Sequence, residues 1–257
     1  MFVKALLIAL WAGIAGVDLF DGLTHIHRPI VTGLVVGIIL GDMKTGLIVG
    51  GSLELVWMGM VPLAGAQPPN VVIGGVIGTS IAILGKLDPQ AAIGIAVPFA
   101  VAVQAAITFI FTIFSVFMHK ADDYAADANT RGIEKINYLG MLILFVFYFV
   151  IAFLPIYLGA DQAAVIVSKI PEWIIQGLSV AGKIMPAIGF AMLLKIMLKK
   201  EYVGFMILGF ILVTYLNLPI LALALVGLCI ALYDYYAAGN RGESVKVNVE
   251  EDYADGI

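Results

Sequence analysis

The stretch HRPIVTGLVVGIILGDMKTGLIVGGSLELVWMGMVPLAGAQPPN, residues 27–70, is largely apolar yet repeatedly interrupted by glycine and proline. Its apolar pieces, such as 29–41 and 45–53, are 9 to 13 residues long. At 1.5 Å rise per residue, such pieces are too short to cross about 30 Å of hydrocarbon alone. Irregular backbone at membrane depth is tolerated where it is buried in protein or lines a water-filled cavity. The stretch therefore predicts broken and re-entrant helices around a transport site.

The rest of the chain has the composition of a membrane protein. Of its 257 residues, 62% are hydrophobic and 12% are charged, about half the charged share of a soluble domain. Four segments without Asp, Glu, Lys or Arg each exceed the roughly 20 residues that span a bilayer, namely 55–85, 89–118, 136–160 and 202–233. We predict an all-α polytopic membrane protein, with broken and re-entrant helices in the N-terminal half and more regular transmembrane helices in the C-terminal half.

The polar stretch 119–138 is predicted to be an aqueous loop or an amphipathic helix. Regular helices are expected at 139–158 and 173–198, and a helical hairpin at 203–236. Because cytoplasmic loops carry an excess of Lys and Arg, the polar stretch and the lysines after the second helix are placed inside the cell. We expect one transmembrane domain, residues 1–236, followed by an acidic cytoplasmic tail, residues 237–257.

Glu54 is a carboxylate within the otherwise apolar segment LELVWMG. Because a charged side chain in hydrocarbon costs at least a few kcal/mol, it must face a cavity or a partner. On a helix, Glu54 shares a face with Gly50 and Trp57. A carboxylate that accepts hydroxyl hydrogens, beside an indole that packs on ring C–H groups, suits a sugar. Glu54 and Trp57 are therefore predicted to bind substrate; the alternative for Glu54 is a structural ion pair with Arg28 or Lys44.

Gln67-Pro68-Pro69-Asn70 presents two amides on a backbone that cannot be regular helix. Both prolines lack an N–H, and Pro68 favours extended geometry at Gln67. Amides bind hydroxyl and acetamido groups without the cost of burying charge. Since the flanking residues are apolar, Gln67 and Asn70 are predicted to bind substrate, with an ordinary exposed turn as the alternative.

The segment THIHRP, residues 24–29, is polar and precedes an apolar segment whose helix Pro29 is suited to begin. Its side chains are placed to bind an anion or a hydroxyl at that helix terminus, and His27 is included among the predicted substrate-binding residues. Asp18, at the end of the first apolar segment, either pairs with Arg28 or contacts substrate. Two histidines at i and i+2 do not share a helix face, so no metal site is predicted.

Several classes of protein are disfavoured by the sequence. It contains no phosphate-binding loop, no GxSxG and no HExxH motif. A net charge of −4 gives no broad basic surface for nucleic acid, and a single cysteine excludes an intrachain disulfide. No cofactor is expected. We predict a transport protein and not an enzyme, so that any chemistry on the cargo would come from a partner.

The segment HRPIVTGLVVGIILGDMKTGLIVGGSLELVWMG, residues 27–59, resembles the membrane IIC subunit of mannose-family phosphotransferase systems. That family has HRP-type, LGD-x-x-TG and GG-x-x-E segments in this order. The resemblance extends over the whole chain and includes IPEWIIQGLSVAGKIMPAIGFAMLLKIM, residues 170–197. AGAQPPN, residues 64–70, and the acidic terminus EEDYADGI, residues 250–257, are most similar to the N-acetylgalactosamine or galactosamine branch.

The resemblance implies a sugar-translocating subunit of the bacterial inner membrane that crosses the membrane several times. It implies a second membrane subunit, IID, and cytoplasmic IIA and IIB phosphocarriers that relay a phosphoryl group from phosphoenolpyruvate to the sugar. It also implies a trimer of IIC–IID pairs. Its motifs carry binding roles over to Glu54, Gln67 and Asn70.

Two other classes remain open from the residues alone. The chain is alternatively a stand-alone sugar transporter coupled to H⁺ or Na⁺, with Glu54 as the proton site. A third alternative is a membrane scaffold in which glycines at every fourth position, Gly33, Gly37 and Gly41, serve only the assembly of helices.

Overall fold

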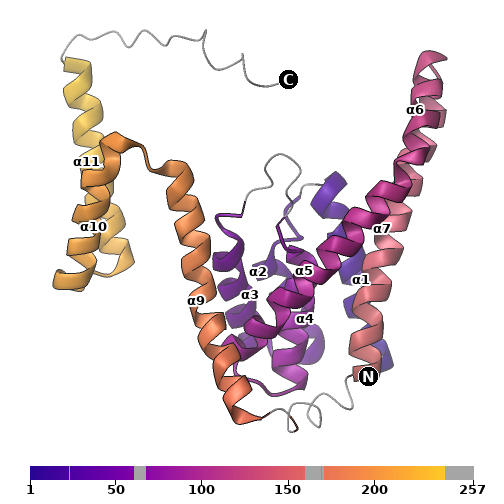
Figure 1. The fold of residues 1–257 in the computed structure, drawn as a ribbon, viewed down its shortest axis with the longest axis horizontal. Coiled ribbons are helices and arrows are strands. Elements are labelled where there is room, and N and C mark those ends of the chain that lie inside the picture. The colour runs from indigo at the N-terminus through magenta and orange to yellow at the C-terminus, as the bar shows by residue number, and fades with distance from the viewer. Residues whose placement is uncertain (23, 61–67, 160–168, 170, 241–257) are drawn as a thin grey trace. The chain divides into compact units, whose positions relative to one another are not determined.

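The computed structural model describes residues 1–22, 24–60, 68–159, 169 and 171–240, with the side chains of 238–240 excepted. The chain divides into two compact units, Met1–Ile196 and Met197–Ile257, which we describe separately (Figure 1). The described residues of both units form helices and no strands, as predicted. Within the described part of the chain, five helical segments are long and apolar enough to cross a membrane: Phe2–Gly22, Pro89–Phe114, Thr130–Gly159, Glu172–Met197 and Ile220–Ala237. The predicted all-α membrane fold class is confirmed.

The first unit contains most of the helices. In chain order they are α1 (Phe2–Val17), the π-helix η1 (Asp18–Gly22), α2 (Pro29–Leu40), α3 (Met43–Trp57), α4 (Val71–Leu84), α5 (Pro89–Phe114), α6 (Val116–Ala126), α7 (Thr130–Gly159) and α9 (Glu172–Met197). Helices α2, α3 and α4 have 12, 15 and 14 residues. At 1.5 Å rise per residue these helices are too short to span the hydrocarbon core unaided, as the sequence predicts.

Helices α2 and α3 form a tight hairpin. Gly41 ends α2 with a φ of 99°, a left-handed conformation that favours glycine. Asp42 caps α3 by accepting hydrogen bonds from the Thr45 hydroxyl (2.6 Å) and backbone N–H (3.0 Å). These bonds hold the pKa of the Asp42 carboxyl below its ordinary value. The hairpin helices meet at glycines: an added Cβ on Gly37 would lie 3.1 Å from the Gly46 Cα, so no larger residue fits.

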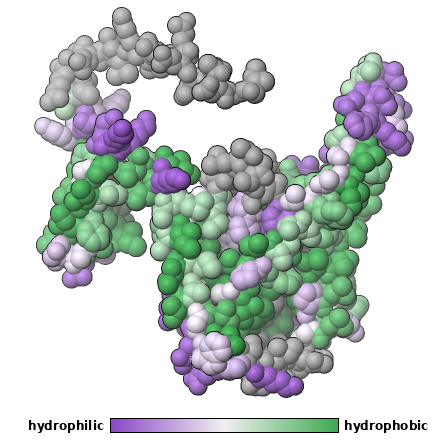
Figure 2. Space-filling view, viewed as in Figure 1, coloured by the Kyte–Doolittle hydropathy of each residue, from purple (hydrophilic) through white to green (hydrophobic). Residues whose placement is uncertain are grey.

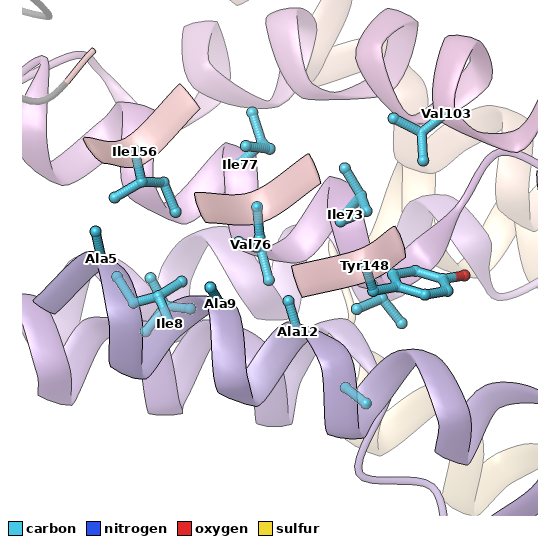
Figure 3. Close-up of a cluster of buried hydrophobic side chains, with 14 of the residues drawn as sticks. Ala5, Ile8, Ala9, Ala12, Ile73, Val76, Ile77, Val103, Tyr148 and Ile156 are labelled. Atoms are coloured by element: carbon cyan, nitrogen blue, oxygen red, sulfur yellow. The ribbon is translucent and has the colours of Figure 1, made fainter. Parts of the chain in front are cut away.

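The main apolar core lies where α1, α4, α5 and α7 meet (Figure 3). Small residues of α1, including Ala9 and Ala12, bring this helix close to Ile73 and Val76 of α4 and to Tyr148 of α7. A second core cluster joins α3 to α4 and α5. Helix α4 belongs to both neighbourhoods, and ten of its residues are buried. It is the central helix around which the first unit packs.

Helix α9 approaches the rest of the first unit through glycines. An added Cβ on Gly94 of α5 would lie 3.2 Å from the Leu178 Cα, and one on Gly189 would lie 3.1 Å from the carbonyl carbon of Val56. The Ser179 hydroxyl donates to the Asp88 carboxylate at 3.1 Å. The outer faces of this unit's helices remain largely apolar, with polar side chains gathered at the tip of α6 and at the opposite end of the bundle (Figure 2). This pattern suits a protein surrounded by lipid.

The second unit contains the 3-10 helix η2 (Lys200–Tyr202), α10 (Val203–Leu216) and α11 (Ile220–Asn240). Asn217 separates α10 from α11 with a φ of 48°, and the two helices contact each other, in agreement with the predicted helical hairpin at 203–236. Helix α11 continues to Asn240, three residues beyond the start of the predicted tail. Residues 241–257 lie outside the described part of the chain, and the predicted domain boundary stays a prediction.

Two sequence predictions differ in detail from the structure. The polar stretch 119–138 is divided between α6 and the first turns of α7, so α7 begins nine residues before the predicted helix at 139. The turn between them is closed by Asn129, whose side-chain oxygen accepts a hydrogen bond from the Gly132 N–H at 3.0 Å. A polar helix end can extend beyond the apolar span because water satisfies its side chains, which hydropathy alone does not reveal.

Candidate functional site

A cavity of about 400 Å³ lies where the short helices of the first unit begin and end. This volume falls within the range of small-molecule sites. Its lining comes from the π-helix after α1, the start of α2, the end of α3, and the facing parts of α4 and α5. The lining residues are Leu19, Phe20, His27, Arg28, Pro29, Glu54, Trp57, Met60, Pro68, Pro69, Asn70, Val71 and Gln104.

Four of the six predicted substrate-binding residues, His27, Glu54, Trp57 and Asn70, line this cavity together. The fifth, Asp18, contacts His27 from outside the lining. The sixth, Gln67, lies outside the described residues. The structure therefore brings together residues that the sequence separates by up to 43 positions, from His27 to Asn70.

Glu54 forms an ion pair with Arg28, and its Oε2 accepts a hydrogen bond from the Ile30 N–H at 3.4 Å. The ion-pair alternative is thus correct for Arg28 and not for Lys44. The pair does not remove Glu54 from the site, because both partners line the cavity and the Arg28 side chain is 49% exposed. The Glu54 side chain is 16% exposed, so the pair is only partly open to solvent. The carboxylate is positioned by Arg28 and remains at the cavity wall.

The Trp57 indole is fixed at both of its ends. Its Nε1 donates to the Pro69 carbonyl at 2.8 Å, and its ring packs so closely on Gly74 that an added Cβ there would lie 3.1 Å from Cζ2. The proline pair leaves this carbonyl outside any regular helix, which makes it available as an acceptor. Since the indole N–H is used, Trp57 offers the cavity an apolar ring and not a donor.

Asn70 connects three helices through a single side chain that is 1% exposed. Its Oδ1 accepts from the Ile73 N–H at 3.0 Å and so caps α4, while its Nδ2 donates to the Gln104 side-chain oxygen at 3.3 Å and to the Tyr148 hydroxyl. Its backbone N–H donates to the Ala100 carbonyl at 3.1 Å. Both amide hydrogens of Asn70 are therefore engaged by protein groups.

Gln104 and Tyr148 were not among the substrate-binding residues predicted from the sequence. Each is a polar group in a long apolar helix, and such groups in membrane proteins usually face a partner or a cavity. That signal was present in the sequence. Gln104 also lines the cavity, so Asn70 helps to hold a second amide at the site.

Asp18 pairs with His27 and not with Arg28. Its Oδ2 lies 2.7 Å from the His27 Nδ1, and its Oδ1 accepts from the Thr24 hydroxyl (2.6 Å) and N–H (2.7 Å). Asp18 and His27 are 4% and 7% exposed. Of the two alternatives for Asp18, the pair with Arg28 is not formed, because Arg28, at the start of α2, is directed to Glu54. Sequence proximity alone does not reveal this direction.

Within the described ranges, no three His, Cys, Asp or Glu side chains are grouped so as to hold a metal ion. The charged and polar groups at the cavity are a carboxylate, a guanidinium, an imidazole and two amides. Together with an indole face, this set suits a neutral ligand with several hydroxyl or amide groups, because such a ligand both donates and accepts hydrogen bonds.

Comparisons with known proteins agree with this interpretation. A family model described as the PTS system sorbose-specific IIC component matches residues 2–233. N-acetylgalactosamine permease IIC component 1 of Escherichia coli strain K12 is 38% identical over 261 residues, which cover 99% of this chain and 98% of that protein.

Two solved structures are also similar. One, entitled "Structure of membrane protein", has a TM-score of 0.79, and a chain of the mannose transporter ManYZ in complex with microcin E492 has a TM-score of 0.58. Each is 29% identical to this chain, and each match covers 92% of this chain and 96% of the other.

Proposed function

This chain belongs to the IIC family of mannose-type phosphotransferase systems, whose family model is described as the sorbose-specific IIC component, and from that membership we propose that it carries an amino sugar, with N-acetylgalactosamine favoured. It is a sugar-permease component of the bacterial inner membrane and crosses that membrane several times. The single observation that carries the proposal is the cavity that gathers Glu54, Trp57, Asn70 and His27. The N-acetylgalactosamine relative, at 38% identity over nearly the whole chain, supports the choice of sugar.

The cavity residues have complementary roles in this proposal. The Glu54 carboxylate accepts hydrogen bonds from sugar hydroxyls, and the Trp57 ring packs against an apolar face of the sugar ring. Gln104, whose side-chain oxygen accepts from the Asn70 amide, adds a polar side chain to the wall that would face the acetamido group. Gln67 is proposed to add a further amide on the basis of its place in the AGAQPPN motif.

The partners are also part of the proposal. The similar ManYZ chain belongs to a two-protein mannose transporter, which supports a second membrane subunit, IID, for this chain. We propose that cytoplasmic IIA and IIB proteins supply the phosphoryl group and that the complex is a trimer of IIC–IID pairs. The sugar's 6-hydroxyl would then point toward the cytoplasmic partner, since in-line transfer requires aligned donor and acceptor.

A competition series tests the binding mode. In the complex with IID, 6-deoxy-N-acetylgalactosamine should compete with radiolabelled N-acetylgalactosamine within about threefold yet never become phosphorylated. Sugars altered at the 2-substituent or at the 4-hydroxyl should bind roughly fivefold more weakly, because each lost hydrogen bond is worth about 1 kcal/mol. Loss of binding on removal of the 6-hydroxyl, with the ring changes tolerated, would show that the proposed orientation is wrong.

A second experiment, with the purified chain alone, distinguishes this function from an ion-coupled transporter. The purified chain alone, reconstituted in vesicles with an H⁺ or Na⁺ gradient, should accumulate no sugar. Gradient-driven uptake without IID, IIA and IIB would favour the ion-coupled alternative instead.

A further inference from the structure

Transfer of a phosphoryl group to a sugar hydroxyl releases the proton of that hydroxyl, so the site requires a proton acceptor. We infer that His27 accepts this proton and that Asp18 is the positioning residue that holds His27 in the required tautomer. The inference rests on the proposed function, since it assumes that the sugar is phosphorylated while bound in the cavity.

The first observation is the way in which Asp18 is used. Its two oxygens receive four hydrogen bonds or close polar contacts: Thr24 N–H and hydroxyl on Oδ1, and His27 N–H (3.3 Å) and Nδ1 (2.7 Å) on Oδ2. A carboxylate engaged at both oxygens has little capacity left for a sugar. Asp18 therefore organises the turn before α2 and fixes the His27 ring.

The second observation concerns the tautomer of His27. An ionised carboxylate only accepts hydrogen bonds, so the ring nitrogen that faces it at 2.7 Å carries the hydrogen. In the neutral ring the other nitrogen, Nε2, then has a free lone pair. His27 lines the cavity, and its Nδ1 side is occupied by Asp18. Nε2 is consequently the ring nitrogen available to a ligand.

The third observation is the state of the other titratable groups at the cavity. Among the described lining residues these are Arg28 and Glu54, which neutralise each other in an ion pair. A proton taken up by Glu54 would break this ion pair and leave the Arg28 cation without its partner. The amides of Asn70 and Gln104 are not bases. His27 is thus the best available proton acceptor in the described lining.

The fourth observation places this group at a suitable end of the first unit. Phe20 and Asp21, in the π-helix that Asp18 begins, share an apolar cavity with Met118 and Asn137 of α6 and α7. The 119–138 stretch at this end is the one that the positive-inside rule assigns to the cytoplasm. A cytoplasmic phosphoryl donor would approach from the same side.

The sugar oxygen attacks the phosphorus of a phosphohistidine on the cytoplasmic partner, so that an O–P bond forms while the N–P bond breaks. The electron pair of the N–P bond returns to the partner's histidine. The hydroxyl proton moves to Nε2 of His27, and the resulting imidazolium is stabilised by the Asp18 carboxylate. The proton passes to water when the phosphorylated sugar leaves.

The test compares His27→Asn with His25→Asn in the complete complex with IID, IIA and IIB. Asparagine at position 27 can still donate to Asp18 but has no basic nitrogen. His25 is exposed, its ring lies beside that of His27, and its φ of 66° is one that asparagine adopts readily. It is therefore a matched control for the loss of one imidazole from the same turn.

We expect His27→Asn to bind N-acetylgalactosamine within about threefold of wild type while the phosphorylation rate falls at least about a hundredfold, the usual contribution of general base catalysis. His25→Asn should change neither quantity. Unchanged phosphorylation would overturn the inference, and so would an equal loss of binding and phosphorylation, which would make His27 a sugar ligand. Absence of sugar binding by the wild type would instead contradict the proposed function.

A second variant covers the case in which His27→Asn fails to assemble with IID. In Asp18→Asn, the amide can donate to Nδ1 of His27 and so favour a hydrogen on Nε2. In that tautomer Nε2 cannot accept the proton of the sugar hydroxyl. The maximal phosphorylation rate should fall while the KM for sugar stays near that of wild type. A change in KM alone, with the maximal rate retained, would contradict the positioning role.

Discussion

Helices α4 and α10 each have 14 residues and are strongly apolar, yet they differ in how many of their residues are buried. Ten residues of α4 are buried, whereas none of α10 is. Helix α4 reads VVIGGVIGTSIAIL, with three glycines and two hydroxyls, and α10 reads VGFMILGFILVTYL, with bulkier side chains. In a membrane, lipid is as apolar as a protein core, so hydropathy does not decide which helix is buried. Small residues do, because they let backbones approach closely.

The two regions also differ in the polar groups that surround α4 and α10. Asn70 caps α4 itself, and the helices α3 and α5 that α4 touches carry Glu54 and Gln104, so the polar groups of the cavity gather around α4. Helices α10 and α11 present large apolar side chains to their surroundings, such as Phe210 at 67% exposure. The buried region can hold charges and amides because protein groups satisfy them, which lipid cannot do.

Added bulk at a glycine should have opposite effects in the buried region and in α10. Leucine at Gly46 would drive its Cβ to 2.9 Å from the Gly37 Cα, which is backbone and cannot move aside. Gly209 of α10 has no atom within 4 Å of an added Cβ. We expect Gly46→Leu to abolish assembly of the complex and Gly209→Leu to leave it intact, as measured by size-exclusion chromatography in detergent. Equal behaviour of the two variants would show that close glycine packing does not distinguish the regions.

A smaller effect is expected when only a charge is removed from the buried region. Glu54→Gln keeps the side-chain shape but loses the charge-assisted part of its hydrogen bonds, worth about 1.5–3 kcal/mol, so sugar affinity should fall roughly ten- to hundredfold. Glu201→Gln, at an exposed carboxylate of the second unit, is the control and should have no effect. Isothermal titration calorimetry measures both. Unchanged affinity in Glu54→Gln would assign Glu54 to the ion pair with Arg28 alone.

The smallest effect should follow from removal of one hydroxyl group. Tyr148→Phe deletes the acceptor of the Asn70 amide in the core, whereas Tyr215→Phe removes a hydroxyl from a side chain that is 76% exposed on α10. Hydrogen bonds between membrane helices average about 0.6 kcal/mol, so Tyr148→Phe should lower the melting temperature of the complex slightly. Tyr215→Phe should leave it unchanged. A larger loss of sugar affinity than of stability in Tyr148→Phe would indicate that Tyr148 orients Gln104 through Asn70.

The membrane fold class, the broken helices of residues 27–70 and the family could all be predicted from the sequence alone. Glu54 and Trp57 were predicted to bind substrate because a charge in an apolar helix needs a cavity or a partner, and His27 and Asn70 because proline motifs place polar side chains at helix ends. The structure places all four at one cavity, and their role in binding stays a prediction. Each of these inferences depends on local pattern, since helix length, helix breaks and the cost of burying charge follow from neighbouring residues.

The tertiary structure decided which groups pair. Asn70 bonds to Gln104 and Tyr148, which lie 34 and 78 positions away, and Arg28 turns to Glu54 while Asp18 turns to His27. Such partners are selected by the packing of helices, and a local pattern does not specify which face of one helix meets which face of another. Packing also explains why α4 is buried and α10 is not. A glycine permits close approach only where a second helix packs against it, and the glycines of α10 have no such neighbour within 4 Å of an added Cβ.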